Sequence, residues 1–121
     1  MKISIVGGGY VGIVSGSCFA QFGNDVTIID IDPKKVQLIN NGQSPFYEKG
    51  LDDLLTQNVG LRLHASSSYD SVANADIVII CVDTPSRSDG SANLLHVESA
   101  CVSIGTQLKT NPHYCVVIVK S

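Results

Sequence analysis

Three glycines near the start of the chain have a spacing that suits the binding of phosphate groups. Gly7, Gly9 and Gly12 follow the pattern G-x-G-x-x-G, after a short apolar run and before an amphipathic stretch. In this pattern the first glycine permits a tight turn, the second lets the backbone approach a pyrophosphate, and the third allows a helix to pack closely on a strand. The N-terminus of that helix would present free N–H groups and a partial positive charge to the phosphates. The alternative is a purely structural glycine-rich turn.

An acidic residue that could bind a ribose follows at the distance that this pattern requires. Asp30 stands eighteen positions after the last of these glycines, at the end of a β-branched run. Its carboxylate can accept hydrogen bonds from both hydroxyls of an adenosine ribose and would repel a 2′-phosphate, which favours NAD over NADP. Asp32 is the competing candidate, but it directly precedes Pro33 and is expected to be a helix N-cap. Lys34 and Lys35 weaken the preference for NAD, because a nearby cation can bind a 2′-phosphate.

The rest of the chain alternates between apolar runs and amphipathic stretches, which indicates strands connected by helices. We expect strands at residues 3–6, 26–29, 61–63, 77–82 and 114–119. We expect helices at residues 10–22 and 33–41, a short helix with Leu51, Leu54 and Leu55, and a brief helix between residues 66 and 73. A last helix, capped by Asn93, is expected to bury a stripe made of Leu94, Val97, Cys101, Ile104 and Leu108. The alternation predicts an α/β fold, a Rossmann-type doubly wound parallel sheet with helices on both faces.

The last predicted strand ends two residues before the end of the 121-residue sequence. In an open parallel sheet, the C-terminal ends of the strands form the ligand crevice. We therefore expect residues 1–121 to be a single NAD-binding Rossmann domain, the N-terminal fragment of a longer multidomain protein that is truncated after its fifth main strand.

The composition excludes several classes of protein. Eight Lys and Arg against eleven Asp and Glu give a net charge of −3 without any basic run, which argues against a nucleic-acid or anionic-membrane partner. Apolar residues make up 44% of the chain and charged residues 16%, so a folded core is expected rather than disorder. No apolar stretch reaches the ~18–20 residues of a membrane span, and the N-terminus lacks the apolar core of a signal peptide. We expect a cytoplasmic protein.

The four cysteines lie far apart in the sequence and form no Cys-x-x-Cys pair. A zinc site requires closely spaced pairs, and a disulfide scaffold requires a secreted context. We therefore expect buried, reduced structural thiols, no metal site and no cysteine nucleophile at Cys18, Cys81, Cys101 and Cys115.

Further motifs resemble one family over the whole length of the chain. The matching segments are Met1-Lys2-Ile3, Gly9-Tyr10-Val11-Gly12, Asp30-Ile31-Asp32 with Lys35 and Val36, Pro45-Phe46-Tyr47-Glu48-Lys49-Gly50-Leu51, Val82-Asp83-Thr84-Pro85, Asp89-Gly90-Ser91 and Val119-Lys120-Ser121. The Tyr-Glu-x-Gly-Leu segment and the Thr-Pro loop, in this order and spacing, are the most specific. The chain resembles the NAD-binding domain of the nucleotide-sugar dehydrogenases, the family typified by UDP-glucose 6-dehydrogenase.

The resemblance implies an enzyme of two Rossmann-type domains joined by a long helix, with the sugar nucleotide bound between them. Such enzymes use two NAD to oxidise the primary alcohol at C6 of the sugar to a carboxylate, through intermediates on a cysteine of the second domain. The resemblance thus places the catalytic residues after Ser121 and implies a homodimer for the full-length protein, with this fragment inactive alone. It implies cofactor contacts at Gly7, Gly9, Tyr10, Val11, Gly12, Asp30, Lys35, Val82, Thr84, Pro85 and Ser121.

Two interpretations remain open for several of these residues. Tyr10 either faces the cofactor cleft or packs beneath it, and Glu48 either shapes the crevice entrance or caps the helix that follows. Thr84-Pro85 could simply terminate a strand. Two residues depart from the family pattern: Lys49 replaces a proline, and Asp83 replaces glycine or asparagine, which adds a negative charge near the nicotinamide end.

The substrate is ranked by weaker signals. UDP-glucose comes first because of Tyr47, GDP-mannose second because Cys81-Val82 before Thr84-Pro85-Ser86 resembles that branch, and UDP-N-acetylmannosamine third. A regulatory NAD-sensing domain, like those attached to potassium transporters, would share the glycines and the ribose acid, but would not need the Tyr-Glu-x-Gly-Leu or Thr-Pro segments. A methyltransferase that binds S-adenosylmethionine is a third class, and the position of Gly12 speaks against it.

Overall fold

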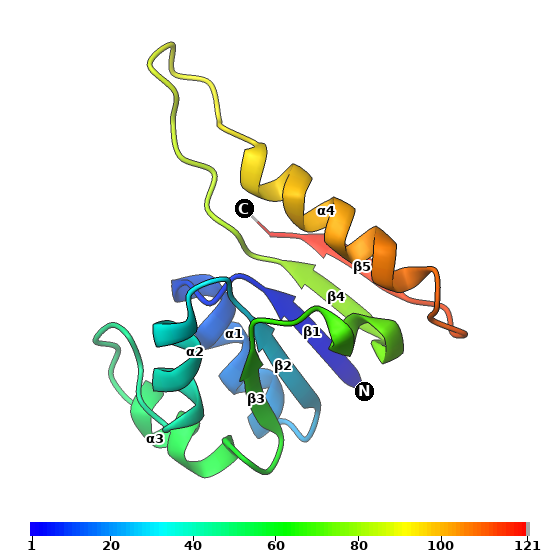
Figure 1. Ribbon diagram of the computed structural model, residues 1–121. Coiled ribbons are helices and arrows are strands. Elements are labelled where there is room, and N and C mark those ends of the chain that lie inside the picture. The colour runs from blue at the N-terminus through cyan, green and yellow to red at the C-terminus, as the bar shows by residue number, and fades with distance from the viewer. Residues whose placement is uncertain (121) are drawn as a thin grey trace.

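The computed structural model describes residues 1–120 as a parallel five-stranded sheet with helices on both faces (Figure 1). The strands are β1 (Lys2–Val6), β2 (Asp25–Ile29), β3 (Leu63–Ser66), β4 (Ile77–Ile80) and β5 (Val116–Val119). The helices are α1 (Tyr10–Gln21), α2 (Pro33–Asn40), α3 (Leu51–Asn58), the 3-10 helix η1 (Asp70–Asn74) and α4 (Leu95–Leu108). The strand order is β3-β2-β1-β4-β5, so the direction of winding reverses between β1 and β4. The predicted Rossmann-type doubly wound fold is confirmed.

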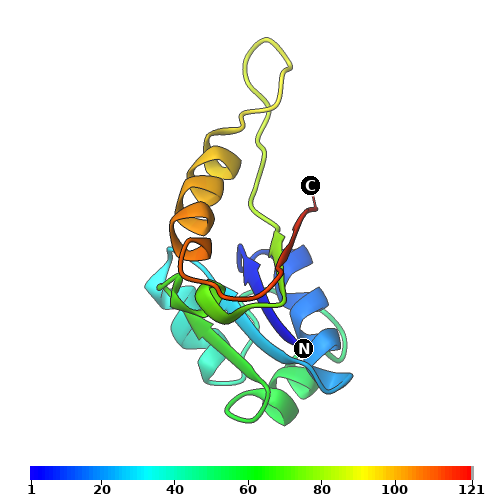
Figure 2. The ribbon, with the colours of Figure 1, turned by 90° about the vertical axis from the view of Figure 1, so that its right-hand side faces the viewer.

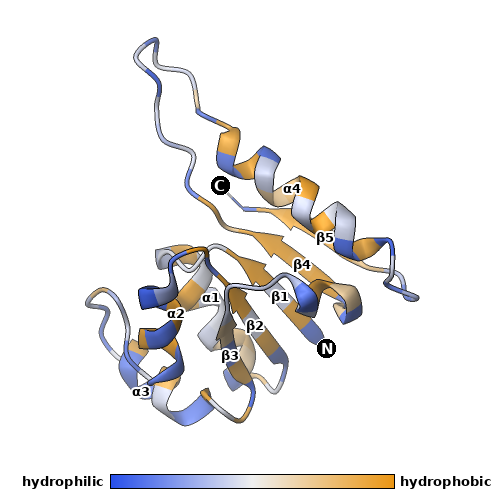
Figure 3. Ribbon diagram, viewed as in Figure 1, coloured by the Kyte–Doolittle hydropathy of each residue, from blue (hydrophilic) through white to orange (hydrophobic). Residues whose placement is uncertain are grey.

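Two apolar layers hold the sheet between its helices, and Figure 3 shows the central strands as mostly hydrophobic. Successive side chains of a strand point to opposite faces of the sheet. Ile5 and Ile28, both 0% exposed, pack on the face covered by α1, α2 and α3. Val6 and Ile80 pack on the opposite face, against η1 and α4. Burial on both faces explains why the central strands are apolar at nearly every position.

Short-range signals set the ends of the first helices as predicted. Asp32 Oδ1 accepts a hydrogen bond from the Lys34 N–H at 2.9 Å, and Pro33 is the first residue of α2, so Asp32 is the N-cap. Gly23 follows α1 with a φ of 89°, and Gly42 follows α2 with a φ of 74°. Both glycines adopt the left-handed conformation that commonly ends a helix.

The strand predicted at residues 61–63 begins later than expected. β3 starts at Leu63, and Leu61 is 72% exposed. The reason is a tight turn before the strand, in which Gly60 has a φ of 78°. In this turn the Asn58 carbonyl accepts hydrogen bonds from the N–H groups of Leu61 and Arg62 at 3.1 and 2.9 Å. A three-residue alternation of apolar and polar side chains could not reveal that turn.

The brief helix predicted between residues 66 and 73 is also shifted. Ser66 remains in β3, and η1 begins at Asp70. Ser68 Oγ accepts a hydrogen bond from the Asp70 N–H at 3.2 Å and so forms a local turn just before η1.

α4 buries only part of the predicted stripe, since Ile104 is buried and Leu108 packs against the same core, but Leu94 and Cys101 do not. Ala100 and Ile104 are each 2% exposed, whereas Leu94 is 46% exposed and Cys101 is also exposed. Successive residues of an α-helix are rotated by about 100°, so the burial of Ala100 turns Cys101 toward solvent. The small side chain of Ala100 lets α4 pack closely on the sheet. The N-cap of α4 is Leu94, one residue after the predicted Asn93, although Asn93 Oδ1 accepts a hydrogen bond from the Leu95 N–H at 3.1 Å.

The two edges of the described sheet differ. Asn40 covers the outer edge of β3, because its side-chain amide donates to the Ala65 carbonyl at 2.9 Å and accepts from the Ala65 N–H at 2.8 Å. β5 forms the other edge, and its four residues are 41% to 57% exposed. The strand predicted at residues 114–119 is present, but shorter.

A long loop between β4 and α4 projects beyond the C-terminal ends of the strands (Figures 1 and 2). Ser86 and Ala92 form an isolated antiparallel bridge within it. The Asp89 side chain accepts hydrogen bonds from the N–H and the hydroxyl of Ser91, at 3.0 and 2.6 Å, which stabilise a turn in this loop. Thr84-Pro85 lies at the base of this hairpin.

Candidate functional site

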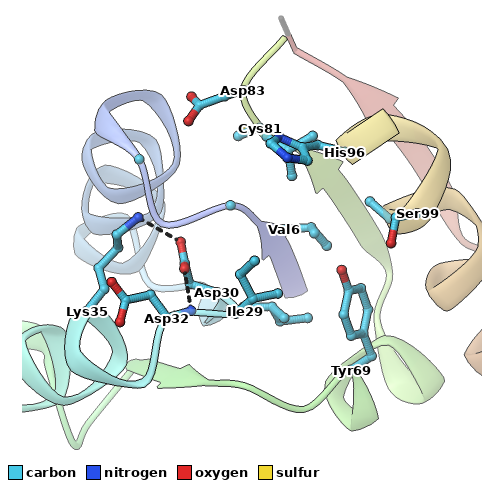
Figure 4. Close-up of a pocket in the computed structure, with 15 residues that line it drawn as sticks. Val6, Ile29, Asp30, Asp32, Lys35, Tyr69, Cys81, Asp83, His96 and Ser99 are labelled. Carbon is cyan, nitrogen blue, oxygen red and sulfur yellow. Dashed lines mark hydrogen bonds and ion pairs between the residues drawn. The ribbon is translucent and has the colours of Figure 1, made fainter. Parts of the chain in front are cut away.

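A cavity of about 340 Å³ lies where the strand order reverses, at the C-terminal ends of β1, β2 and β4 (Figure 4). Open parallel sheets bind their ligands at such a reversal. The cavity is lined by Val6, Gly7, Gly9, Ile29, Asp30, Ile31, Asp32, Lys35, Tyr69, Cys81, Val82, Asp83, His96, Ser99 and Ala100. The structure thus brings the predicted phosphate loop and the predicted ribose acid into one cavity.

The three glycines of the predicted pattern have different geometric roles. Gly7 has a φ of 109°, and a Cβ there would lie 2.5 Å from the Cys81 carbonyl oxygen. A Cβ at Gly12 would collide with the Gly7 carbonyl oxygen. Nothing lies within 4 Å of a Cβ built at Gly9, which lines the cavity. Gly7 and Gly12 therefore permit the turn and the packing of α1, while the backbone at Gly9 stays open to a ligand.

The N-terminus of α1 beside this loop can attract an anion. Gly9 is the N-cap, no side chain caps the helix, and its first turn contains no acidic residue. The first N–H groups of α1, among them those of Val11 and Gly12, therefore keep their partial positive charge and their capacity to donate. This combination fits the diphosphate of a dinucleotide.

Asp30 is held in one orientation at the end of β2 by three donors. Its Oδ2 accepts from the Gly8 N–H at 2.7 Å and from Lys35 Nζ at 3.1 Å, and its Oδ1 accepts from the Asp32 N–H at 2.9 Å. Figure 4 shows the contacts with Lys35 and Asp32 as dashed lines. A carboxylate has about four lone-pair positions, so these three bonds leave Oδ1 able to accept from a hydroxyl group. The Asp30 side chain is 10% exposed.

Gly8 and Lys35 complete the surroundings of Asp30. Gly8 was not among the predicted site residues, although a Cβ there would lie 2.9 Å from Asp30 Oδ2. The sequence signal for this role was that Gly8 is an additional glycine inside the G-x-G-x-x-G pattern. Lys35 forms an ion pair with Asp30 and lines the cavity, so the predicted ribose site carries a paired rather than an isolated negative charge.

The residues predicted after β4 separate into two groups. Val82 and Asp83 both line the cavity. Thr84 and Pro85 are not among the cavity-lining residues and lie at the base of the projecting hairpin. The prediction for Ser121 falls outside the described residues.

Sequence reasoning missed one wall of the cavity. Tyr69 directly precedes η1, His96 and Ser99 lie at the start of α4, and all three side chains line the cavity (Figure 4). Burial raises the pKa of the Tyr69 hydroxyl, which therefore stays protonated at neutral pH. Helical periodicity places His96 and Ser99 on one face, but it does not reveal that the helix begins beside the ends of β1 and β4.

Tyr10 and Glu48, each of which had two interpretations, are in direct contact with each other. Tyr10 Oη donates a hydrogen bond to Glu48 Oε2 at 2.6 Å, and the Tyr10 ring lies 5.2 Å from the ring of Phe46, centroid to centroid. Tyr10 is not among the residues that line the cavity. α3 has Gly50 as its N-cap without a side-chain hydrogen bond, so Glu48 does not cap it.

The cysteines are not alike. Cys81 is buried in the cavity wall, Cys18 and Cys115 are half-buried, and Cys101 is exposed, so the prediction of a buried thiol was wrong for Cys101. Burial raises the pKa of the Cys81 thiol and so disfavours the thiolate. Among residues 1–120, no three His, Cys, Asp or Glu side chains gather as a metal site would require. Within the same range, no helix is long and apolar enough to cross a bilayer.

Comparison with known proteins places this geometry in a family. The model of the "UDP-glucose/GDP-mannose dehydrogenase family, NAD binding domain" matches residues 1–121. UDP-glucose 6-dehydrogenase of Rhizobium meliloti is 44% identical over 124 residues, which cover 100% of this chain and 28% of that protein.

Two solved structures share the fold over the whole chain. A ternary complex of GDP-mannose dehydrogenase from Pseudomonas aeruginosa superposes with a TM-score of 0.96 at 37% identity, covering 100% of this chain and 28% of that one. UDP-N-acetyl-mannosamine dehydrogenase from Staphylococcus aureus gives a TM-score of 0.89 at 30% identity, covering 100% and 29%. The chain therefore spans less than a third of the length of these relatives.

The full-length match to the family model agrees with the glycine loop, the acid at the end of β2 and the cavity between them. The chain belongs to the UDP-glucose/GDP-mannose dehydrogenase family, as its NAD-binding domain.

Proposed function

We propose that the cavity binds NAD with its diphosphate on the loop of Gly7, Gly9 and Gly12, against the N–H groups of Tyr10 and Val11. Asp30 and Lys35 then lie at the adenosine ribose, where Asp30 Oδ1 accepts from a hydroxyl. The adenine lies against the wall that contains Tyr69, His96 and Ser99, and the nicotinamide end points toward Val82, Thr84 and Pro85. NAD supplies the hydride acceptor, while the residues of this chain bind and orient it.

One observation carries this proposal. The backbone at Gly9 opens into the same cavity as the Asp30 carboxylate, and a Cβ at Gly9 would meet nothing within 4 Å. A structural turn has no need of an uncapped helix N-terminus that faces a cavity, because unsatisfied N–H groups usually gain a side-chain cap. The alternative of a purely structural turn is therefore the weaker one.

Calorimetric titration of the protein with NAD, NADP and S-adenosylmethionine tests the proposal. We expect binding of NAD, weaker binding of NADP and none of S-adenosylmethionine. Binding of S-adenosylmethionine in preference to NAD would refute it and would favour the methyltransferase class.

For the whole protein, we propose that this chain is the N-terminal NAD-binding domain of a nucleotide-sugar 6-dehydrogenase. The proposed reaction oxidises the C6 primary alcohol of UDP-glucose to the carboxylate of UDP-glucuronate. Two hydrides pass to two NAD, water supplies the second carboxylate oxygen, and protons are released. The catalytic residues would lie outside residues 1–121, and a homodimer is the proposed assembly. Relatives named for UDP-glucose and for GDP-mannose resemble the chain to similar degrees, at 44% and 38% identity, so GDP-mannose and UDP-N-acetylmannosamine are the rival substrates.

Counting NADH against sugar consumed tests this part in the longer protein that carries the domain. NAD is mixed separately with UDP-glucose, GDP-mannose and UDP-N-acetylmannosamine. Two NADH per molecule of UDP-glucose would support the proposal, and two per molecule of another sugar would replace the substrate. Intact NAD binding without NADH from any of the three sugars would favour a sensing domain.

A further inference from the structure

The loop at residues 41–50, between α2 and α3, is attached to the start of α1 by one side chain. Tyr10 Oη donates to Glu48 Oε2 at 2.6 Å, across 38 positions of sequence. The rings of Tyr10 and Phe46 are 5.2 Å apart and tilted by 35°, a favourable aromatic arrangement. Figure 1 shows this loop beside α2 and α3, at the left of the view. Because both contacts end on Tyr10, this residue links the loop to α1.

α1 begins without the local devices that usually order a helix N-terminus. Its N-cap is Gly9, no side chain caps it, and its first turn has no acidic residue. Gly7, Gly8 and Gly9 precede it, and glycine loses more conformational freedom on ordering than any other residue. The missing cap leaves N–H groups available to a phosphate, but it also leaves the first turn prone to fraying.

Tyr10 is the first helical residue, so its side chain is placed to order that turn from outside the helix. The hydrogen bond to Glu48 and the contact with Phe46 restrain the side chain, and with it the backbone that carries the first N–H groups of α1. A binding site that is ordered before the ligand arrives loses less entropy on binding.

We propose that Glu48 is a positioning residue for the diphosphate site, acting through Tyr10. The inference rests on the proposed binding of the NAD diphosphate at the N-terminus of α1. Neither side chain lines the cavity, and neither needs to touch the cofactor, because the effect is to hold the first turn of α1 in its binding conformation.

The hydrogen bond, rather than the charge of Glu48, carries the effect. The hydrogen bond to Glu48 and the nearby negative charge raise the pKa of Tyr10, so its hydroxyl stays a donor throughout the neutral range. Glutamine at position 48 would keep an acceptor oxygen and lose the charge, whereas alanine would lose both. Glu48→Gln is therefore the conservative variant that separates the two effects.

Calorimetric titration with NAD tests the proposal. The proteins compared are the wild type, Glu48→Ala, Glu48→Gln, Tyr10→Phe and the double variant Tyr10→Phe/Glu48→Ala. We expect Glu48→Ala and Tyr10→Phe each to weaken NAD binding about threefold to tenfold, the range for one net hydrogen bond. Glu48→Gln should stay within about twofold of the wild type. The double variant should bind no more weakly than either single variant, because all three lack the same bond. Asp53→Ala, which removes an exposed carboxylate from the first turn of α3, is the control and should leave binding unchanged.

Two further measurements separate positioning from general stabilisation. Glu48→Ala should speed amide hydrogen exchange at Ile13, whose N–H donates to the Gly9 carbonyl at 3.0 Å, while leaving the amides of β1 and β4 protected. Alkaline titration by ultraviolet absorbance should show a lower pKa for Tyr10 in Glu48→Gln, identified by the signal that Tyr10→Phe removes.

Unchanged or tighter NAD binding by Glu48→Ala would overturn the proposal. A further loss of NAD affinity when Glu48→Ala is added to Tyr10→Phe would also overturn it. So would an exchange rate of the Ile13 amide in Glu48→Ala that equals the wild-type rate. If the wild type itself fails to bind NAD, the proposed function is refuted, independently of Glu48.

Discussion

Asp30 places a carboxylate at the proposed position of the adenosine ribose, and Asp30→Asn removes its charge while almost keeping its shape. The asparagine oxygen can still accept the hydrogen bond that Asp30 Oδ2 accepts from the Gly8 N–H at 2.7 Å. Lys35, whose Nζ is 3.1 Å from that oxygen, would lose its counter-charge. The substitution therefore converts a neutral ion pair beside the ribose into a single positive charge.

The magnitude follows from the burial of the pair. The Asp30 and Lys35 side chains are 10% and 30% exposed, so solvent screens them only in part. Two unit charges about 4 Å apart interact by ~4 kcal/mol at an effective dielectric constant of ~20. Asp30→Asn should tighten NADP binding by ~10- to 100-fold. The carboxylate would no longer repel the 2′-phosphate of NADP, and Lys35 would be free to pair with that phosphate. NAD binding should weaken by ~10- to 100-fold, because a hydrogen bond to a charged group is worth ~1.5–3 kcal/mol.

Calorimetric titration of wild type and Asp30→Asn with NAD and NADP measures the change in preference. Asp25→Asn is the matched control, because it removes the same charge at the opposite end of β2. There, Asp25 Oδ1 lies 3.6 Å from Arg62 Nη1. An unchanged ratio of the NAD and NADP dissociation constants in Asp30→Asn would refute the reasoning. An equal shift in Asp25→Asn would show that net charge, and not the position of Asp30, sets the preference.

Three further outcomes are expected. Gly12→Ala should lower the free energy of unfolding in urea by ~1–3 kcal/mol, because its Cβ would meet the Gly7 carbonyl, while Gly105→Ala, with open space around its Cβ, should not. Burial raises the pKa of Tyr69 above its usual value, so its stabilising contribution is present below about pH 10 and is lost as the pH rises through the raised pKa. Above about pH 10, the free energy of unfolding in urea should therefore fall less steeply with rising pH in Tyr69→Phe than in the wild type. Asp83→Asn should tighten NAD binding by about threefold at low salt and by less at high salt, since an exposed negative charge at the cavity is removed; weaker binding would contradict this.

Features set by neighbouring residues were predictable from the sequence. Asp32 before Pro33 identified a helix start, because an N-cap and a proline at the first helical position act within one turn. The glycine pattern located the turn between β1 and α1, because the backbone at Gly7 and Gly12 leaves no room for a Cβ. The apolar runs identified the central strands, because burial on both faces of a sheet requires apolar side chains at successive positions.

The errors came from short patterns and from rotation about a helix. Leu61 looked like part of a strand, but Gly60 makes a turn there, and three residues are too few to establish a period of two. Cys101 was assigned to the buried face of α4, although burial of Ala100 turns it outward. Ile104 was placed correctly, but Cys101 lies about 100° around the helix from Ala100, and the sequence pattern alone did not show which edge of the stripe is buried.

The sequence by itself determined the class of fold, the glycine turn between β1 and α1 and the position of the acid at the end of β2, because each depends on residues close together in the chain. Only the tertiary structure decided which distant residues share the site. The reversal of strand order between β1 and β4 brings Tyr69, His96 and Ser99 opposite the glycine loop. The path of the loop between α2 and α3 brings Glu48 to Tyr10. Such contacts depend on how the elements pack, and a local sequence pattern carries no record of the distances between elements.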